Sequence, residues 1–325
     1  MSEQDSMESG FSPEQQVQYT ALTESVGSVE LSNWTMLEMR GDDRHSFLSG
    51  FCTAEIKSLK VGEVTEAFVL NGKGKILGHL HVANLSDRML LVGPGEQAAS
   101  VSEHLDRYLI REKVEIVDRS AETSFVLLVG PSADGVIESA FGESVVTEKA
   151  CEVSDSIVSI ESEFAGTARL LCVASNQLAS VTEVLSEHGV VSCDAAVLEP
   201  IRLQAGTPWF GVEVDETNLP QEVDRDDKAI SFTKGCYLGQ ETVARIDSLG
   251  RVNRLLRIAR VTGPSPQVGS SVFVEDKDAG TVKATSAVPG RSDGICTLMV
   301  KRAYAKTGQV LQSGDAELTI VEALS

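Results

Sequence analysis

The segment of this sequence with the most chemical potential is the octet K-G-C-Y-L-G-Q-E at residues 234–241. Its thiol, Cys236, lies two positions after Lys234, and the residues after the octet predict a helix. A cysteine in the first turn of a helix interacts with the positive end of the helix dipole, and a nearby ammonium group acts in the same direction. Both effects favour thiolate over thiol. The octet therefore predicts a reactive or ligand-binding Cys236, on a backbone turn that Gly235 permits.

The alternative interpretation is that Cys236 is a small buried side chain, because unpaired cysteine is among the most buried residue types. The other cysteines are far apart and form no C-x-x-C pair or close Cys/His cluster; they are Cys52, Cys151, Cys172, Cys193 and Cys296. The sequence thus predicts neither structural zinc nor a self-sufficient iron–sulfur site. Cysteines this sparse in a chain of 325 residues are typical of a reduced, cytoplasmic protein.

The elements that would position the octet follow from the sequence pattern. Residues 64–70 and 75–84 predict two strands, joined by a hairpin turn at 71–74 whose two glycines suit positive φ angles. Helices are predicted at 97–110, from Leu178 to a stop at Gly189, and at 195–204, where Pro200 would mark the start. Short strands punctuated by Gly and Pro follow residue 251, a pattern typical of a sandwich or barrel. The predicted fold class is α+β with a C-terminal β unit.

Composition and charge exclude several classes of protein. The chain has 48 acidic and 28 basic residues, a formal net charge of −20, so it offers no general basic face to nucleic acid or anionic membranes. No apolar run approaches the roughly 20 residues that span a bilayer. The first 28 residues contain five acidic residues and no Lys or Arg. They predict a disordered acidic leader and neither a secretory signal nor a transit peptide.

The octet resembles the K-G-C-[FY]-x-G-Q-E signature of the YgfZ folate-binding proteins, which are related to the glycine-cleavage aminomethyltransferase GcvT. Other resemblances are R-x-x-x-G-x-P-x-x-G at 202–211, L-P-x-E at 219–222, and L-N-G-K-G-K-I-L at 70–77. Together they cover about residues 30 to 260. The resemblance implies subdomains around a central folate channel, followed by a small β-barrel. It also implies that tetrahydrofolate or a related folate binds, that iron–sulfur enzymes are assembled or repaired with its help, and that function depends on Cys236.

On this basis we predict a leader at 1–28, a folate-binding body at 29–250 with a second subdomain at about 119–195, and a barrel at 251–325. Cys236 is the predicted functional thiol, and Lys234 would tune it. The candidate folate contacts are Lys73, Lys75, Arg202, Trp209, Glu222, Tyr237, Gln240, Glu241 and Arg245. Two of these assignments have structural alternatives. The lysines could keep a hairpin edge soluble, and the tryptophan is favoured as a core residue.

The resemblance leaves open whether the protein is a transferase or an accessory factor. The related aminomethyltransferases carry carboxylates where this chain has Gly78 and His79, and a carboxylate suits the proton transfers of that reaction. This departure favours a folate-binding accessory protein. A one-carbon transferase that uses His79 as its base is the alternative, and a hydrolase built on Cys236 is a third, although no histidine follows Gly189.

Three further patterns bear on the site. His79 and His81 alternate on one strand, either lining a pocket or metal site or, as we favour, lying on an exposed face. The acidic run at 215–227 predicts a solvated loop, with Glu222 as an exception. Residues 234–260 contain six basic and two acidic residues, and this local excess of positive charge predicts a cationic wall for an anionic folate.

Overall fold

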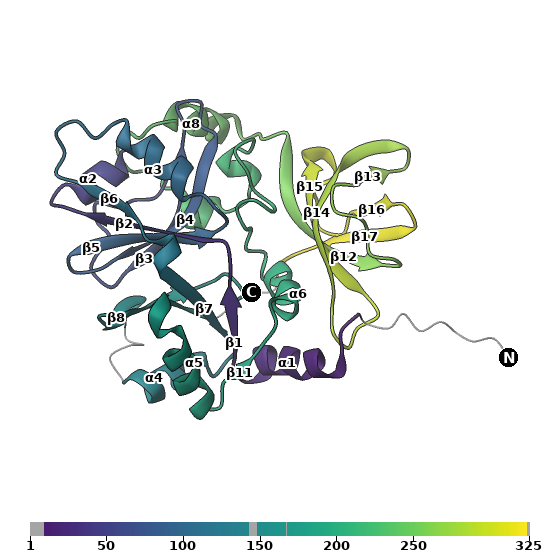
Figure 1. The fold of residues 1–325 in the computed structure, drawn as a ribbon. Coiled ribbons are helices and arrows are strands. Elements are labelled where there is room, and N and C mark those ends of the chain that lie inside the picture. The colour runs from purple at the N-terminus through teal and green to yellow at the C-terminus, as the bar shows by residue number, and fades with distance from the viewer. Residues whose placement is uncertain (1–9, 143–147, 167, 324–325) are drawn as a thin grey trace.

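The computed structural model describes residues 10–142, 148–166 and 168–323. Two β-sheets pack face to face, and a closed β-barrel lies beside them (Figure 1). The core between the sheets includes Trp34, Leu90, Leu127 and Leu170. None of the described helices has the length and apolar character to span a bilayer. The predicted α+β body with a C-terminal barrel is confirmed.

The five-stranded sheet is antiparallel and has the order β3-β4-β5-β2-β6. Its strands are β2 (Trp34–Arg40), β3 (Val64–Leu70), β4 (Ile76–Asn84), β5 (Arg88–Pro94) and β6 (Glu115–Asp118). Helices α2 (Arg44–Ser49) and α3 (Ala98–Asp106) cover its outer face, where Leu48 and Val101 join the core. The predicted strands and the hairpin at 71–74 are confirmed, because apolar alternation and turn glycines agree there.

The six-stranded sheet has the order β11-β1-β7-β10-β9-β8. Its strands are β1 (Gly27–Leu31), β7 (Thr123–Val129), β8 (Ala150–Ser154), β9 (Ile157–Ser162), β10 (Ala168–Ala174) and β11 (Val191–Ser192). Helices α4 (Ala133–Phe141) and α5 (Leu178–Glu187) cover its outer face. The N-terminal strand β1 pairs antiparallel with β7 and parallel with β11, so this sheet combines distant parts of the chain.

Helix α1 (Pro13–Glu24) lies within the segment that the sequence predicts to be a disordered leader. A capping box of Ser12 and Gln15 begins this helix, and Leu22 is buried in the core. The prediction is therefore wrong for this helix, because capping and a few apolar contacts outweigh its polar composition. Residues 1–9 of the predicted leader lie outside the described residues.

Helix α6 (Ala195–Ala205) connects the sheets to the segment before the barrel, and it has Pro200 in its interior. The predicted start at Pro200 is therefore wrong, and the helix begins after Asp194. The barrel is closed in the order β12-β15-β14-β13-β16-β17. Its strands are β12 (Arg254–Thr262), β13 (Ser271–Val274), β14 (Lys277–Ala287), β15 (Gly294–Lys301), β16 (Val310–Ser313) and β17 (Ala316–Val321). Closure leaves no exposed sheet edge and buries an apolar interior.

Candidate functional site

Cys236 lies in the loop that joins α7 (Asp226–Ala229) to α8 (Gln240–Leu249). All six cysteines are described, and Cys236 is the exposed one; Cys151 is half-buried and the others are buried. The interpretation of Cys236 as a buried hydrophobic residue is therefore wrong. So is its placement in the first helical turn, because α8 begins four residues later, after Gly239 as N-cap. The positive φ angle is at Gly239, at +84°, and not at Gly235.

Lys234 anchors the octet to the end of α2. It is buried, and its Nζ donates hydrogen bonds to the carbonyl oxygens of Ser49 at 2.8 Å, Cys52 at 3.0 Å and Ala54. The last carbonyls of a helix lack partners within the helix, so a cation is well placed there. Burial lowers the pKa of Lys234. The ammonium group thus holds the loop, and its predicted tuning of the thiol stays a prediction.

Tyr237 is a core residue beside the thiol. Its ring is buried in a cluster that includes Phe68, Ile76 and Val243, and it lies under the ammonium group of Lys234 at 5.1 Å. Burial raises the pKa of Tyr237 to about 12. The contacts of Lys234 and Tyr237 therefore fix the octet on both sides of Cys236, and the thiol is exposed on a fixed loop.

The hairpin at 71–74 lies against the start of α8, so two motifs that are distant in sequence meet in space. The hydroxyl of Thr242 donates a hydrogen bond to the carbonyl oxygen of Lys73 at 3.2 Å. A Cβ atom added at Gly74 would lie 2.6 Å from the side chain of Thr242, and one added at Gly239 would lie 2.7 Å from the carbonyl oxygen of Asn71. Both glycines permit this close approach.

A Gly239→Ala substitution is expected to destabilise the protein by about 1–3 kcal/mol, because alanine would be strained at positive φ and would clash with the backbone of Asn71. Denaturant unfolding measures the loss. The matched control is Gly235→Ala in the same octet, where an added Cβ atom meets nothing within 4 Å. Equal stability of the two variants would contradict the close packing of hairpin and octet.

The remaining predicted contacts near the octet have mainly structural partners. Lys75 Nζ donates to the carbonyl oxygen of Thr217 at 2.6 Å, and the carboxylate of Glu222 accepts from the side chains of Asn218 and Arg254. The contact between Glu222 and Arg254, a residue of the barrel strand β12, ties the body to the barrel. The other three candidate folate contacts near the octet, Gln240, Glu241 and Arg245, lie on α8.

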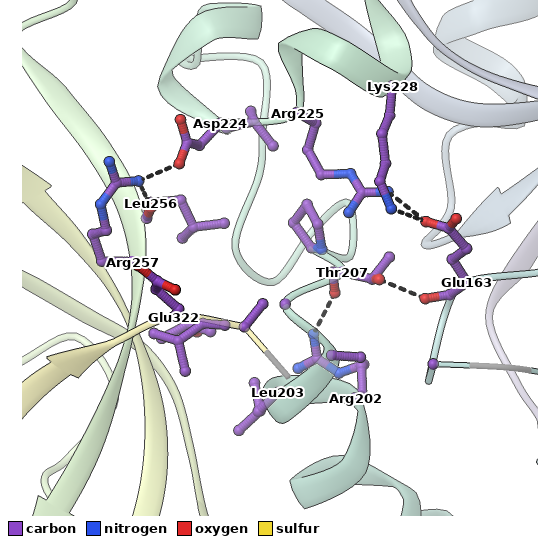
Figure 2. Close-up of a pocket in the computed structure, with 18 of the residues that line it drawn as sticks. Glu163, Arg202, Leu203, Thr207, Asp224, Arg225, Lys228, Leu256, Arg257 and Glu322 are labelled. Atoms are coloured by element: carbon purple, nitrogen blue, oxygen red, sulfur yellow. Dashed lines mark hydrogen bonds and ion pairs between the residues drawn. The ribbon is translucent and has the colours of Figure 1, made fainter. Parts of the chain in front are cut away.

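A cavity of about 950 Å³ lies between the body and the barrel. Figure 2 shows Asp224 and Arg257 on one side of it and Glu163, Arg225 and Lys228 on the other. A volume of this size accommodates a small organic ligand. The structure describes all nine predicted folate contacts, and of these Arg202 alone lines the cavity. The octet and the hairpin are not part of its wall.

Arg202 forms a buried ion pair at the base of the cavity. Its Nη1 lies 2.9 Å from both carboxylate oxygens of Glu213, and its Nη2 pairs with Glu199. Glu213 also accepts a hydrogen bond from the barrel residue Thr297 at 3.2 Å, and the guanidinium of Arg202 lies over the ring of Trp209. Arg202 and Trp209 therefore help to hold the barrel against the body.

A line of polar contacts leads from the cavity into the five-stranded sheet. Arg225 Nε lies 2.8 Å from Glu66 Oε1, which lies 2.6 Å from His79 Nε2, and all three side chains are buried. Arg225 also pairs with Glu163, which holds Lys228. Burial alone would raise the pKa of Glu66, but the hydrogen bonds and charges of His79 and Arg225 lower it. The ionised carboxylate thus fixes both of its neighbours.

Sequence reasoning missed this network. It assigned residues 215–227, apart from Glu222, to a solvated loop, whereas Arg225 is buried and pairs with Glu66. The sequence signal for this network was Arg225, a basic residue inside an acidic run, because a carboxylate buried elsewhere in the fold needs a cation as its partner. Its partner at Glu66 could not be read from local spacing.

His79 and His81 are both buried, so the favoured prediction of an exposed strand face is wrong. Their strand β4 is an interior strand, and packed elements cover both of its faces. His79 stacks on Phe68, and His81 meets the ring of Phe164 edge-on at 4.3 Å. Across the described ranges, no group of three His, Cys, Asp or Glu side chains is arranged to hold a metal ion.

Burial lowers the pKa of His81 to about 4. A histidine in the unfolded chain has a pKa of about 6.5. Between pH 6.5 and pH 4 the unfolded state therefore binds more protons than the folded state, and stability decreases as the pH is lowered. The free energy of unfolding is expected to fall by about 3 kcal/mol from this group between pH 7 and pH 4. His81→Leu should remove that part of the pH dependence in urea unfolding. His188→Gln, at an exposed position, should retain it, and an unchanged slope in His81→Leu would refute the assignment.

Comparisons with known proteins agree with this architecture. The family model of the GCVT N-terminal domain matches residues 6–160. The tRNA-modifying protein YgfZ of Colwellia psychrerythraea is 26% identical over 237 residues, which cover 70% of this chain and 69% of that protein. Its counterpart in Vibrio atlanticus is 28% identical over 267 residues, covering 79% and 76%. An aminomethyltransferase of Geobacillus thermodenitrificans is 23% identical over 312 residues, covering 91% and 84%.

The fold also matches a solved structure. The glycine cleavage system aminomethyltransferase T of Bartonella henselae superimposes with a TM-score of 0.85, over 95% of this chain and 88% of that one. The sequence identity is 16%, so this likeness establishes the shared fold and nothing about the reaction.

Proposed function

Because the chain is a YgfZ-like protein with the fold of the glycine-cleavage aminomethyltransferase, we propose that it is a folate-binding accessory protein for the assembly or repair of iron–sulfur clusters. The exposed thiol of Cys236 carries this proposal. It is fixed in a signature octet by Lys234 and by the hairpin. A thiol held in this way is accessible to an iron–sulfur client enzyme or an assembly factor, the proposed partners.

The cavity fits a reduced folate in size and in charge. Its volume of about 950 Å³ suits a ligand of this class, and cationic side chains suit the carboxylates of a folate. Lys228, Arg257 and Lys306 line it and would hold those carboxylates. A bound tetrahydrofolate would supply a carrier for one-carbon units. Arg202 contributes less to binding, since Glu199 and Glu213 already occupy its guanidinium.

Titration of tetrahydrofolate into the purified protein tests both the ligand and its place. We expect heat of binding in the wild type and at least about threefold weaker binding in Arg257→Gln, which removes a cation from the cavity. The comparison variant is Lys73→Gln/Lys75→Gln, which tests the contacts predicted at the hairpin. Weaker binding in that variant alone would move the ligand to the hairpin, and no heat in the wild type would refute folate binding.

A folate-dependent one-carbon transferase is the second candidate, favoured by the contact of His79 with Glu66. A carboxylate that holds a histidine in place is a common arrangement for a general base. This candidate predicts turnover of an aminomethyl donor by the purified protein, lost in His79→Ala. Tight folate binding without turnover would leave the accessory role.

The name of the YgfZ relatives describes them as tRNA-modifying. Direct contact of this chain with tRNA is disfavoured by its net charge of −20, since binding to a phosphate backbone needs a basic face. We therefore propose that any effect on tRNA passes through an iron–sulfur enzyme that this protein supports.

A further inference from the structure

Four segments of the chain meet at the end of the body that carries Cys236 (Figure 1). They are residues 44–60, 71–75, 98–111 and 231–251, and their exposed side chains form what we call the octet surface. The amide of Leu238 donates a hydrogen bond to the carbonyl oxygen of Gly50 at 2.9 Å, which holds the octet against the end of α2. The hairpin contacts α8 through Lys73 and Thr242. A partner that reaches the thiol therefore also meets this surface.

Aromatic side chains are exposed at the octet surface. In the described part of the chain three aromatic residues are exposed: Tyr108 at 40%, Phe232 at 46% and Phe273 at 37%. Phe232 precedes Cys236 by four positions on the same loop. Tyr108 follows α3, and its ring lies 4.7 Å from that of Phe51, just after α2. Two of the three exposed aromatic residues thus belong to the octet surface, and aromatic side chains are typical anchors of protein interfaces.

The octet surface reverses the charge of the protein. Its four segments contain ten basic and five acidic residues, whereas the whole chain has 28 basic and 48 acidic residues. Seven of the ten basic side chains are exposed and form no ion pair within the described ranges. The five acidic residues are Glu55, Glu103, Asp106, Glu241 and Asp247. They compensate half of the basic residues and leave an excess of five positive charges.

One unpaired cation lies on each of the four segments, namely Lys57, Lys73, Arg107 and Arg245. Lys57 is close enough to the octet that its charge, together with burial, lowers the pKa of Lys234. Arg107 is the C-cap of α3 and directly precedes Tyr108. None of the four lines the cavity between the body and the barrel. Cations spread over an open surface suit an extended acidic partner better than a small anion, which prefers convergent donors.

An acidic protein fits this surface better than a nucleic acid. Single-stranded nucleic acid also binds to cations and aromatic rings. However, an excess of five positive charges in a chain of net charge −20 leaves −25 on the rest of the molecule, which repels a continuous phosphate backbone. The exposed thiol gives a second reason. A thiolate reacts with metals and with sulfur, which a protein partner can carry and which bases and phosphates do not offer.

We propose that the octet surface is the docking site for an acidic face of a protein partner. Phe232 and Tyr108 anchor that partner by their apolar contact. The unpaired cations steer it and orient it, so that Cys236 faces the metal or sulfur that it carries. This inference rests on the proposed role of Cys236, and it adds the surface and the charge of the partner.

The test uses a synthetic peptide of Glu-Glu-Leu repeats as the probe for an acidic face with apolar residues. Titration into the wild-type protein is expected to show binding that weakens at high salt. Bound peptide should also slow the alkylation of Cys236 by iodoacetamide at least about threefold, as measured by mass spectrometry, because it covers the thiol. Absence of binding, or binding that leaves Cys236 unprotected, would overturn the inference.

Two further probes decide the class of partner. A peptide of Gln-Gln-Leu repeats keeps the apolar residues without the charge, and it is expected to bind at least about tenfold more weakly. Equal binding of the two peptides would overturn the role of the cations. Oligouridylate should give little protection, and stronger protection of Cys236 by it than by the acidic peptide would overturn the assignment to a protein.

Substitutions locate the docking site. Lys57→Glu/Arg107→Glu is expected to weaken binding of the acidic peptide at least about tenfold, since two exposed contacts of up to about fivefold each become repulsive. Phe232→Ser should weaken it at least about threefold through the lost apolar contact. The ratio of alkylation rates with and without peptide cancels any direct effect of a charge on the thiol.

The matched controls are Lys277→Glu and Phe273→Ser, which change an exposed lysine and an exposed phenylalanine of the barrel. Both should bind the acidic peptide as the wild type does. Equal losses in the barrel variants and in the variants of the octet surface would show an effect of overall charge and apolar area, and would overturn the proposed location.

Two measurements separate this inference from the proposed function. Lys57→Glu/Arg107→Glu should bind tetrahydrofolate as the wild type does, because neither residue lines the cavity. In a strain that lacks the gene, this variant should restore less iron–sulfur enzyme activity than Lys277→Glu. Full restoration by it would overturn the docking inference and leave the role of Cys236 intact. If Cys236 itself proves dispensable, the proposed function is wrong, and protection by the peptide still tests the surface.

Discussion

A Cys236→Ser variant is expected to leave iron–sulfur enzyme activity in a deletion strain close to the level of the strain without the gene. Serine preserves the size and polarity of the side chain, but its hydroxyl does not replace a thiolate as nucleophile or metal ligand. Cys236 is exposed, so the substitution should change the free energy of unfolding by less than about 0.5 kcal/mol. Enzyme activity in extracts and unfolding of the purified variant give the two measurements.

The matched control is Cys151→Ser, which removes the next most accessible thiol. It should restore the iron–sulfur enzymes to the wild-type level. If Cys236→Ser restores them equally well, the proposed role of this thiol is wrong. Folate binding by Cys236→Ser should be unchanged, because Cys236 does not line the cavity.

A Glu66→Gln variant is expected to lose about 3–5 kcal/mol of stability, because Arg225 and His79 then lack the carboxylate between them. Glutamine keeps the shape of the side chain, so the loss reports the missing charge. Urea unfolding at pH 7 measures the difference. Any loss of folate affinity in this variant reports displacement of Arg225 at the cavity wall.

Glu163→Gln is the matched control, because Glu163 also pairs with Arg225 but is 54% exposed. It should cost less than about 1 kcal/mol. Similar losses from the two variants would show that burial of Glu66 does not control the strength of its contacts.

The same carboxylate makes stability depend on acid. The pKa of Glu66 is lowered in the folded state, so its contribution is present above the unfolded value of about 4.3 and is lost as pH falls below it. The wild type is therefore expected to lose stability faster than Glu66→Gln below about pH 4.

The parts of the fold that the sequence predicts well are those specified locally. The hairpin at 71–74, the stop of α5 before Gly189 and the strands of the barrel follow from turn residues and apolar alternation. Cys236 is exposed, as the reactive or ligand-binding thiol predicted from the octet must be. In each case neighbouring residues determine the outcome.

The predictions that fail depend on distant partners. The exposed face predicted for His79 and His81 is buried, because packed layers cover both faces of β4. The contact of Lys234 with the end of α2 likewise lies outside any local pattern. The expected cationic wall at 234–260 is also largely neutralised. Arg254, Arg257 and Arg260 all pair with acidic residues outside that segment. A count of charges along the sequence cannot show such pairs.

The pairing of β1 has a consequence for the synthesis of the chain. The strands of the five-stranded sheet lie between Trp34 and Asp118, so that sheet can assemble early, from contacts that are close in sequence. The partners of β1 are β7 and β11, which leave the ribosome only after that whole sheet. During translation β1 must therefore remain unpaired while its neighbour forms. Strand β1 therefore has no partner until β7 (Thr123–Val129) has been made.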